Sequence, residues 1–344
     1  MKAAIFHGPG HAISIDEMAM PVCGPDDVMI QIRRCGICGS DISMTNPGPF
    51  AFPPGRIGHE YSGEVVEVGR NVTSIRRGDR VTALTASPCG DCEGCRWGNP
   101  VFCRNPRLNA DGHGGFGGFG EFVSRHHRNV VVLPQSLSFA DGALIEPMAC
   151  GLHALRKAHM QGGERILVIG AGSMALSVVY WARRLGAAKV AAVSRSANNQ
   201  ELVCALGADR MYALNEADIA EVFDFLGGPP DFVAECVGKP GLLDQAVQFV
   251  RPGGTVISMG MCMHAEPFMP AAATFKDLNL VFSVASTMDE FVATARAFDA
   301  DAIRPEVMVN ELIGLQELPM KLEQLRSGQG SGIKVHVDPN LVGE

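Results

Sequence analysis

Four cysteines lie close together between residues 88 and 104 of this 344-residue chain. Cys89, Cys92, Cys95 and Cys103 follow the spacing C-x2-C-x2-C-x7-C. Four thiolates complete the tetrahedral coordination of zinc and leave no position open, so such a site stabilises its loop but binds no substrate. The spacing therefore predicts a structural zinc site. The alternative interpretation is a cluster of free or redox-active thiols.

A second set of metal-binding residue types is dispersed along the chain. It comprises Cys38 in CGICGSD, the adjacent His59 and Glu60, and Glu146 and Cys150 in EPMACG. One thiolate, one imidazole and one further ligand would leave a zinc position free for water or an alcohol oxygen, which is the arrangement of catalytic zinc. A single cysteine or histidine usually has an ordinary packing role. The set indicates chemistry because it accompanies the four-cysteine cluster.

A glycine turn in VIGAGSMA follows an apolar strand and precedes a helical pattern, which is the context of a dinucleotide-binding loop. Its small residues are Gly170, Gly172 and Ala175. They would let pyrophosphate reach the N-terminus of the helix. The end of the next strand carries Ser194, Arg195 and Ser196. NAD-preferring proteins usually have an acidic residue there, whereas a guanidinium and hydroxyls bind a 2′-phosphate, so we expect NADP(H) to be preferred over NAD(H). Alternatively, Arg195 is only a solvated charge.

Two kinds of pattern must position these residues. Up to about residue 150, short alternating segments such as YSGEVVEVG predict strands separated by glycine and proline. From about residue 165, apolar strands alternate with helical patterns, which predicts a parallel sheet covered on both faces. Residues 288–327 predict two more helices, and GIKVHVD predicts a last strand that returns to the first domain. The sequence is therefore that of a two-domain α/β protein.

Composition narrows the functional class. The formal net charge is −8, and the chain has no dense lysine and arginine run, so we expect no nucleic-acid partner. We see no apolar segment of membrane-spanning length and no secretory-signal pattern, so we expect no membrane partner. The odd number of cysteines, 11, argues against a disulfide framework. These features predict a cytoplasmic protein.

The motifs above, taken in order, resemble those of the zinc-dependent medium-chain alcohol dehydrogenase family, and most closely its sorbitol and threonine dehydrogenase branch. They are CGICGSD, GHEYSGEVVEVG, GDRV, CGDCEGCRWGNPVFC, EPMACGLHAL and VIGAGSMA. The resemblance implies a GroES-like β-barrel catalytic domain of residues 1–151 and 288–344. It also implies a Rossmann domain, a doubly wound parallel sheet, of residues 152–287. A homotetramer or homodimer is expected on the same ground.

The resemblance also assigns roles at the dispersed set. Cys38 and His59 would be ligands of a catalytic zinc, making two zinc ions per chain with the structural one. Glu60 would be a neighbouring carboxylate able to approach the metal. Glu146 matches a carboxylate of the sorbitol dehydrogenase type, and Cys150 matches a ligand cysteine of other alcohol dehydrogenases. The third protein ligand is therefore either Glu146 or Cys150.

Proton transfer and orientation of the His59 ring in such an enzyme would depend on two residues that closely follow Cys38. Asp41 would accept the second N–H of His59 and orient the ring. Ser40 would take the proton of the alcohol. The family often has a histidine three residues after this serine to pass the proton on, but this chain has Ser43. The proton path must then end at Ser43, at water or at the cofactor ribose.

We therefore expect a zinc-dependent oxidoreductase that transfers hydride between NADP(H) and a small-molecule secondary alcohol, ketone or aldehyde. The substrate is expected to be fairly apolar, because methionine and phenylalanine residues lie in the segments that would line the pocket. They are Met44, Phe50, Phe52, Phe116 and Phe119. The first alternative is an NAD(P)-dependent polyol dehydrogenase of the sorbitol type. Alternatives of other classes are a zinc-free quinone or enoyl reductase and a non-catalytic NADPH-binding sensor.

Overall fold

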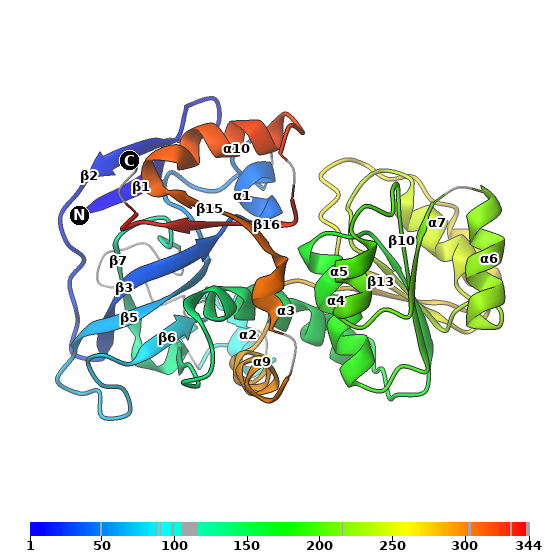
Figure 1. Cartoon of the computed structure of the whole chain (residues 1–344), viewed down its shortest axis with the longest axis horizontal. Helices are drawn as coiled ribbons and strands as arrows, with labels where there is room; N and C mark the ends of the chain where they lie inside the picture. The colour runs from blue at the N-terminus through cyan, green and yellow to red at the C-terminus, as the bar shows by residue number, and fades with distance from the viewer. Residues whose placement is uncertain are drawn as a thin grey trace. The chain divides into compact units, whose positions relative to one another are not determined.

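The computed structural model describes residues 1–48, 50–86, 88–89, 91–97, 100–104, 116–214, 216–301, 304–330 and 332–341. The chain packs as two units (Figure 1), of which the first comprises Met1–Glu146 and Thr287–Glu344 and the second Pro147–Ser286. The division falls at Pro147, inside helix α3 (Phe139–Lys157). The domain bounds expected from the sequence stay a prediction. Residues 112–115, at the start of a glycine-rich segment that runs to residue 120, lie outside the described residues.

The first unit is built on a seven-stranded sheet with the order β15-β16-β3-β5-β6-β8, in which β7 also pairs with β3. Its strands are β3 (Asp27–Gly36), β5 (Glu60–Val68), β6 (Arg80–Ala83), β7 (Phe122–His126), β8 (Val130–Val132), β15 (Val309–Gly314) and β16 (Lys334–Asp338). The long strand β3 pairs with β5 along one edge, and β7 and β16 share the other. Because β16 pairs with β3, the end of the chain is built into the sheet that carries the N-terminal segments.

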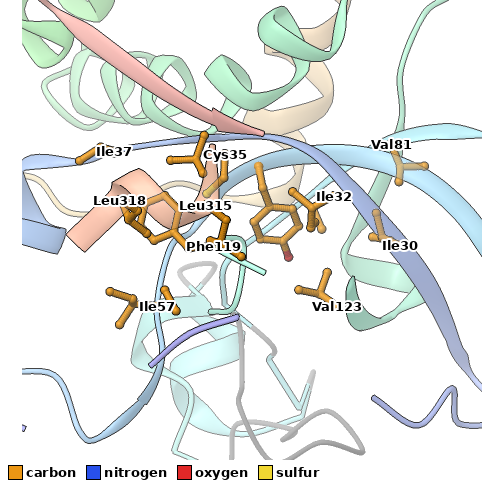
Figure 2. Close-up of a cluster of buried hydrophobic side chains, with 14 of the residues drawn as sticks. Ile30, Ile32, Cys35, Ile37, Ile57, Val81, Phe119, Val123, Leu315 and Leu318 are labelled. Carbon is orange, nitrogen blue, oxygen red and sulfur yellow. The ribbon is translucent and has the colours of Figure 1, made fainter. Parts of the chain in front are cut away.

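A smaller antiparallel sheet with the order β2-β1-β4 lies in the same unit. Its strands are β1 (Lys2–Phe6), β2 (Ser14–Glu17) and β4 (Gly55–Arg56). Side chains of the larger sheet form the core of this unit, as Figure 2 shows for Ile30, Ile32, Val81 and Val123. Ile30 and Ile32 are two residues apart, so they point to the same face of β3. Leu318 of helix α10 (Leu318–Arg326) packs onto this core.

Short helices connect the strands of the first unit. They are α1 (Gly39–Ser43), α2 (Glu93–Arg96), α9 (Met288–Ala300) and α10 (Leu318–Arg326), with 3-10 turns at Pro100–Phe102, His127–Asn129, Pro305–Met308 and Leu315–Glu317. Helix α9 begins with a capping box, in which Thr287 and Glu290 each satisfy the backbone N–H of the other. Helix α1 follows β3 after only two residues, which fixes its place at the end of that strand.

The second unit contains a six-stranded parallel sheet with the order β11-β10-β9-β12-β13-β14. The strands are β9 (Arg165–Ile169), β10 (Lys189–Ser194), β11 (Arg210–Ala213), β12 (Phe232–Glu235), β13 (Thr255–Ser258) and β14 (Asn279–Phe282). The chain starts in the middle at β9, builds outward to β11, and then returns to build β12 to β14. This is the strand order of a Rossmann fold.

Helices cover both faces of this sheet. They are α4 (Ser173–Arg184), α5 (Gln200–Ala205), α6 (Glu216–Leu226), α7 (Leu242–Phe249) and α8 (Pro270–Phe275). Figure 1 shows α4 and α5 on one side of the sheet and α6 and α7 on the other. The predicted doubly wound parallel sheet is therefore confirmed. Among the described residues, no helix combines the length and apolar character needed to span a membrane.

Candidate functional site

The four-cysteine cluster forms around the short helix α2. The sulfur atoms of its cysteines all lie within 4.8 Å of one another. Cys92 Sγ is 3.5 Å from Cys95 Sγ and 3.8 Å from Cys103 Sγ. Cys89 Sγ is 3.8 Å from Cys95 Sγ. Sulfurs on a tetrahedron around zinc, each bonded at about 2.3 Å, are roughly 3.8 Å apart, so the four thiols fit a zinc ion.

Local contacts favour the thiolate form at one cysteine of this cluster and shape the turn around it. Backbone N–H groups of Cys95 and Arg104 lower the pKa of the Cys92 thiol to about 6, which favours the thiolate form that binds zinc. Gly94 lies where the loop turns back on itself, and a Cβ there would be 1.8 Å from the carbonyl oxygen of Phe102. Glycine is therefore the residue that lets α2 pack against the segment before Cys103. Gly90 and Gly98, which we also expect to allow tight turns in this segment, lie outside the described residues.

Cys38 and His59 meet because α1 and β5 begin beside each other at the end of β3. Cys38 is the N-cap residue of α1, and its backbone N–H donates to Asp41 Oδ2 at 2.9 Å. His59 immediately precedes β5, and Glu60 is the first residue of that strand. One donor atom from each of Cys38, His59 and Glu60 lies within 4.8 Å of the other two. The structure thus brings together three residues that are 22 positions apart at most.

His59 is buried, and its two ring nitrogens face different groups. Nδ1 lies 3.4 Å from Asp41 Oδ1, and Nε2 lies 3.4 Å from Ser40 Oγ. Burial by itself would lower the pKa of His59, but Asp41 and Cys38 more than offset this effect and hold that pKa well above its ordinary value. The geometry suits the predicted role of Asp41, because a proton held on Nδ1 leaves Nε2 free to bind metal.

Glu60 pairs with Lys334 of β16, a residue that sequence reasoning missed. Lys334 Nζ donates to the two carboxylate oxygens of Glu60 at 2.7 and 2.9 Å and to the carbonyl of Ile37 at 3.1 Å. Both charged side chains are 1% exposed. A Cβ at Gly36 would lie 2.3 Å from Glu60 Oε2, so a larger residue at position 36 would displace the carboxylate. The alternation of residues around Lys334 predicts which face of the strand it occupies. It does not predict that Glu60 is its partner, so the sequence contains little indication of this pair.

The open set fits a zinc ion by the chemistry of its donors. A thiolate, an oriented imidazole and a carboxylate within 4.8 Å of one another are ligand types that zinc accepts. Both oxygens of Glu60 already hold Lys334, so Glu60 approaches a metal only by giving up part of that pair. Cys38 and His59 are therefore the better placed donors.

Glu146 and Cys150 both lie on helix α3 but in different units. Glu146 ends the first unit, and burial raises its pKa to about 7. His59 and Lys334 oppose this rise, while Glu60 adds to it, so Glu146 lies within electrostatic reach of the open set. It is nevertheless not among the three residues whose donor atoms lie within 4.8 Å. Cys150 belongs to the second unit.

Phe116 and Phe52 form an aromatic surface beside His59. Their ring centroids are 5.0 Å apart in an edge-to-face arrangement. The Phe116 ring also meets the His59 ring edge-to-face, with centroids 5.7 Å apart. Met44 is half-buried and Phe50 is 61% exposed. An apolar surface therefore lies directly against a predicted metal ligand.

The expectation that Phe119 lines the pocket is wrong. Its side chain is fully buried, and Figure 2 shows it among the core residues of the first unit. A Cβ at Gly58 would lie 2.7 Å from the Phe119 ring, which shows how tightly that ring fills the space beneath residue 58. Two phenylalanines three residues apart in a glycine-rich segment look alike in sequence, and only the backbone path separates their roles.

The cofactor turn has the geometry that its residue types predict. Gly170 has φ +127°, a conformation that favours glycine, and its N–H donates to the carbonyl of Val193 at 2.8 Å. Gly172 is the N-cap of α4, and a Cβ there would meet nothing within 4 Å, so the helix N-terminus is open to an anion. Ala175 is buried, and its Cβ would be only 3.4 Å from a Cβ at position 170.

The three residues expected to select the cofactor lie at the same edge of the sheet. β10 and β9 pair in parallel, with Val193 opposite Ile169, so their carboxyl ends are neighbours. Ser194 ends β10, and Arg195 and Ser196 follow it. Both of the following residues are exposed. Arg195 is thus an exposed residue that directly follows the strand end next to the glycine turn.

Comparisons with known proteins cover both units. Residues 24–135 match the family described as Alcohol dehydrogenase GroES-like domain, and residues 170–300 match the family described as Zinc-binding dehydrogenase. Sorbitol dehydrogenase of Bos taurus is 28% identical over 352 residues, which cover 98% of this chain and 96% of that protein.

Two solved structures are similar along nearly their whole length. 2R,3R-butanediol dehydrogenase from Bacillus subtilis is 28% identical with a TM-score of 0.85, covering 98% of this chain and 99% of that one. A protein from Sinorhizobium meliloti 1021, solved with NADP bound, is 28% identical with a TM-score of 0.83 and the same coverage.

Proposed function

The chain belongs to the zinc-dependent medium-chain alcohol dehydrogenase family, and from this premise we propose that it interconverts a fairly apolar secondary alcohol and its ketone with NADP(H). The alcohol or polyol dehydrogenase class and the GroES-like and Rossmann folds follow from the family. The cofactor preference and the substrate are the proposal. The observation that carries it is the placement of Cys38, His59 and Ser40 beside the aromatic surface of Phe52 and Phe116.

We assign one zinc to the four-cysteine cluster and a second to the open set. Cys38 and His59 would hold the second ion, with Glu146 as the third ligand and Cys150 as the alternative. Zinc bound there supplies a Lewis acid that lowers the pKa of an alcohol oxygen. Glu60, held by Lys334, contributes negative charge close by. Metal analysis of the purified enzyme should find two zinc ions per chain.

The protein groups around the open set handle orientation and protons. Asp41 holds the His59 ring, and Ser40 accepts the proton of the alcohol. From Ser40 the proton passes to Ser43, water or a cofactor hydroxyl. The aromatic surface of Phe52 and Phe116 holds the apolar part of the substrate away from water. The Gly170–Gly172 turn would bind the pyrophosphate of the cofactor, which would supply or accept the hydride.

NADP(H) preference is supported by the exposed Arg195 beside the glycine turn and by the absence of an acidic residue at positions 194–196. The NADP-bound relative from S. meliloti is consistent with it. The test is initial rates with NADPH and NADH for the parent and for Arg195→Ala. Losing a charge-assisted hydrogen bond to phosphate should raise KM for NADPH roughly tenfold or more and leave KM for NADH unchanged.

Arg184→Ala is the matched control for this comparison. Arg184 is the last residue of α4, about 17 Å from the N-terminus of that helix, and so it should not affect either cofactor. Preference of the parent enzyme for NADH would contradict the proposed preference for NADP(H). Arg195 would then have no role in cofactor selection.

The second candidate is a polyol dehydrogenase, and the similarity to sorbitol dehydrogenase and butanediol dehydrogenase favours it. Rates on a panel of ketones and alcohols, from short aliphatic to aromatic and sugar-derived, separate the two. Faster oxidation of sorbitol-type polyols than of aliphatic secondary alcohols would support the hypothesis of a polyol dehydrogenase. Binding of NADPH without turnover of any compound, with zinc present, would favour a sensor.

We also propose a cytoplasmic enzyme, because its many thiols suit a reducing compartment.

We propose that the enzyme is a homodimer or homotetramer. β14 is the last strand of the parallel sheet, and among the described residues no strand pairs with its outer edge. Apolar side chains around it are exposed, notably Phe275 (91%), Phe282 (58%) and Val284 (48%). A second copy could add its own β14 to this edge about a two-fold axis and cover these side chains.

A further inference from the structure

Two arginines are buried in the first unit beside residues 116–119. Arg56 at the end of β4 is 4% exposed, and Arg125 in β7 is fully buried. Arg125 Nε donates to the hydroxyl of the buried Tyr61, and its guanidinium carbon lies 5.4 Å from the centre of that ring. Arginine is rarely buried unless its donors are used, so the partners of this arginine pair indicate its role.

The arginine pair holds backbone carbonyls of the segment that carries Phe116. Arg125 Nη2 donates to the carbonyl of Phe116 at 3.3 Å. Arg56 Nη2 donates to the carbonyl of Gly117 at 3.1 Å and also to that of Phe122. Hydrogen bonds from a charged donor are about twice as strong as neutral ones. The two guanidinium groups therefore fix the path of the backbone on both sides of Gly117.

The same segment is bound on its other side to the residues before His59. The N–H groups of Gly117 and Gly118 both donate to the carbonyl of Gly58 at 3.0 Å. The N–H of Phe119 donates to the carbonyl of Ile57 at 3.1 Å. Gly58 directly precedes His59, so the segment links the arginine pair to the predicted metal ligand through the backbone.

Gly117 shows how closely the pair and the segment fit. Its φ is +117°, and a Cβ there would lie 2.7 Å from Arg56 Nη2. Any side chain at position 117 would push the guanidinium away from the carbonyls that it holds. Phe116, the neighbouring residue, has its ring against both His59 and Phe52.

We propose that Arg56 and Arg125 are positioning residues that set the Phe116 ring against His59 and thereby define the width of the apolar side of the substrate pocket. This inference rests on the proposed function for its meaning in catalysis. The arginine pair does not touch the reacting atoms in this assignment. Its loss should let the Phe116 ring move, which changes how large apolar substrates bind and leaves the proton and hydride transfers intact.

The kinetic test compares Arg56→Lys and Arg125→Lys with the parent, using a small and a bulky apolar secondary alcohol. Lysine keeps the positive charge but lacks the fork that reaches two acceptors. We expect the ratio of KM values for the two alcohols to change by roughly tenfold, as for a misfitted apolar pocket, with kcat for the small alcohol within about twofold of the parent.

Arg80→Lys is the matched control. Arg80 on β6 also donates to two backbone carbonyls, those of Gln135 and Leu137, but neither belongs to the segment beside His59. This variant should leave the KM ratio unchanged. If the Arg56→Lys and Arg125→Lys variants also keep the KM ratio of the parent for the two alcohols, the proposal is wrong.

A second measurement needs no substrate. In Phe116→Trp, acrylamide quenching of the added tryptophan, taken by difference from the parent, reports how well the ring at position 116 is held. Adding Arg125→Lys or Arg56→Lys should raise the quenching constant at least about twofold, as expected for a ring released from a packed site, whereas adding Arg80→Lys should not. Unchanged quenching in both arginine variants overturns the proposal.

The two measurements separate this inference from the proposed function. If the parent prefers polyols, the apolar substrate class fails, while the quenching comparison still decides whether the arginines position residue 116. If the arginine variants do not accumulate as folded protein, Gly117→Ala disturbs the same contact from the side of the segment. It must then reproduce the change in KM ratio, and an unchanged ratio counts against the proposal.

Discussion

Lys334 and His336 are two residues apart on β16, so they project from the same face of the strand, and both are buried. Lys334 is compensated by Glu60, whereas neither ring nitrogen of His336 has a hydrogen-bond partner among the described residues. Burial on its own would lower the pKa of Lys334, but Glu60 raises it above its usual value. The two residues thus represent opposite solutions to the burial of a basic side chain.

Replacing one member of the Glu60–Lys334 pair should be far more damaging than replacing both. Lys334→Met leaves Glu60 buried without its cation, and we expect a loss of about 3–5 kcal/mol in the free energy of unfolding. Lys334→Met combined with Glu60→Gln should recover part of that loss. Urea unfolding of the zinc-loaded enzyme measures both, and Lys157→Met, at an exposed lysine, is the control. A loss below about 1 kcal/mol in Lys334→Met would show that the pair contributes little.

His336 should make the protein sensitive to acid. Burial, with smaller effects of Lys334 and Arg34, lowers its pKa from 6.5 to about 3. The unfolded chain therefore takes up this proton below about pH 6.5 while the folded protein does not, so stability falls as the pH drops from 6.5 toward 3. At pH 5 this one group should account for roughly 2 kcal/mol of lost stability relative to pH 7.

His336→Leu should remove that share of the pH dependence, and His264→Asn, at an exposed histidine, should not. Unfolding free energies at pH 7 and pH 5 for the parent and both variants make the comparison. Metal loss in acid affects all three proteins alike and cancels in the differences. Parallel pH profiles for the parent and His336→Leu would mean that His336 finds a partner in solution.

At the scale of elements, the clearest sequence predictions concern features that are local in the chain. The four cysteines span 15 residues around one short helix, and the glycine turn joins one strand to the next helix. Both could be predicted because spacing alone fixes the geometry there. The Lys334–Glu60 pair and the Arg125–Phe116 contact could not be predicted in this way. They depend on which strands become neighbours and on the backbone path of a glycine-rich segment.

Helix α2 offers a test of the structural zinc site through packing rather than through a ligand. Gly94→Ala would place a Cβ 1.8 Å from the carbonyl oxygen of Phe102, so the helix cannot pack where Cys95 and Cys103 meet. We expect zinc content to fall from two ions to one per chain and trypsin to cut after Arg96 or Arg104. Gly48→Ala, where a Cβ would meet nothing within 4 Å, is the control. Retention of both zinc ions in Gly94→Ala would contradict the assignment.

At the scale of the whole molecule, periodicity and motif order gave the parallel sheet and the family, because strand and helix alternation leaves few topologies. Residue types indicated the open metal set, but the roles of its members were assigned only by resemblance, since Cys38, His59 and Glu146 come from separate segments of the first unit. Phe119 shows the limit of pattern reasoning, because residue type and spacing did not distinguish a core phenylalanine from one beside the site. The sequence alone does not show which residues that are far apart in the chain contact each other in the fold. Several of these contacts involve charged side chains.

The exposed edge of β14 predicts where two copies of the chain associate. Asn279 and Ser283 direct their N–H groups to β13, so by alternation residues 280 and 282 direct theirs to the open edge. Phe282→Lys adds a charge that would face its own copy across a two-fold axis, and it should shift the enzyme to monomer in sedimentation velocity at micromolar concentration. Met320→Lys, at a residue 61% exposed on α10 against 58% for Phe282, adds the same charge elsewhere and should leave the assembly intact. An unchanged oligomer in Phe282→Lys, or an equal effect of both variants, would place the interface on another surface.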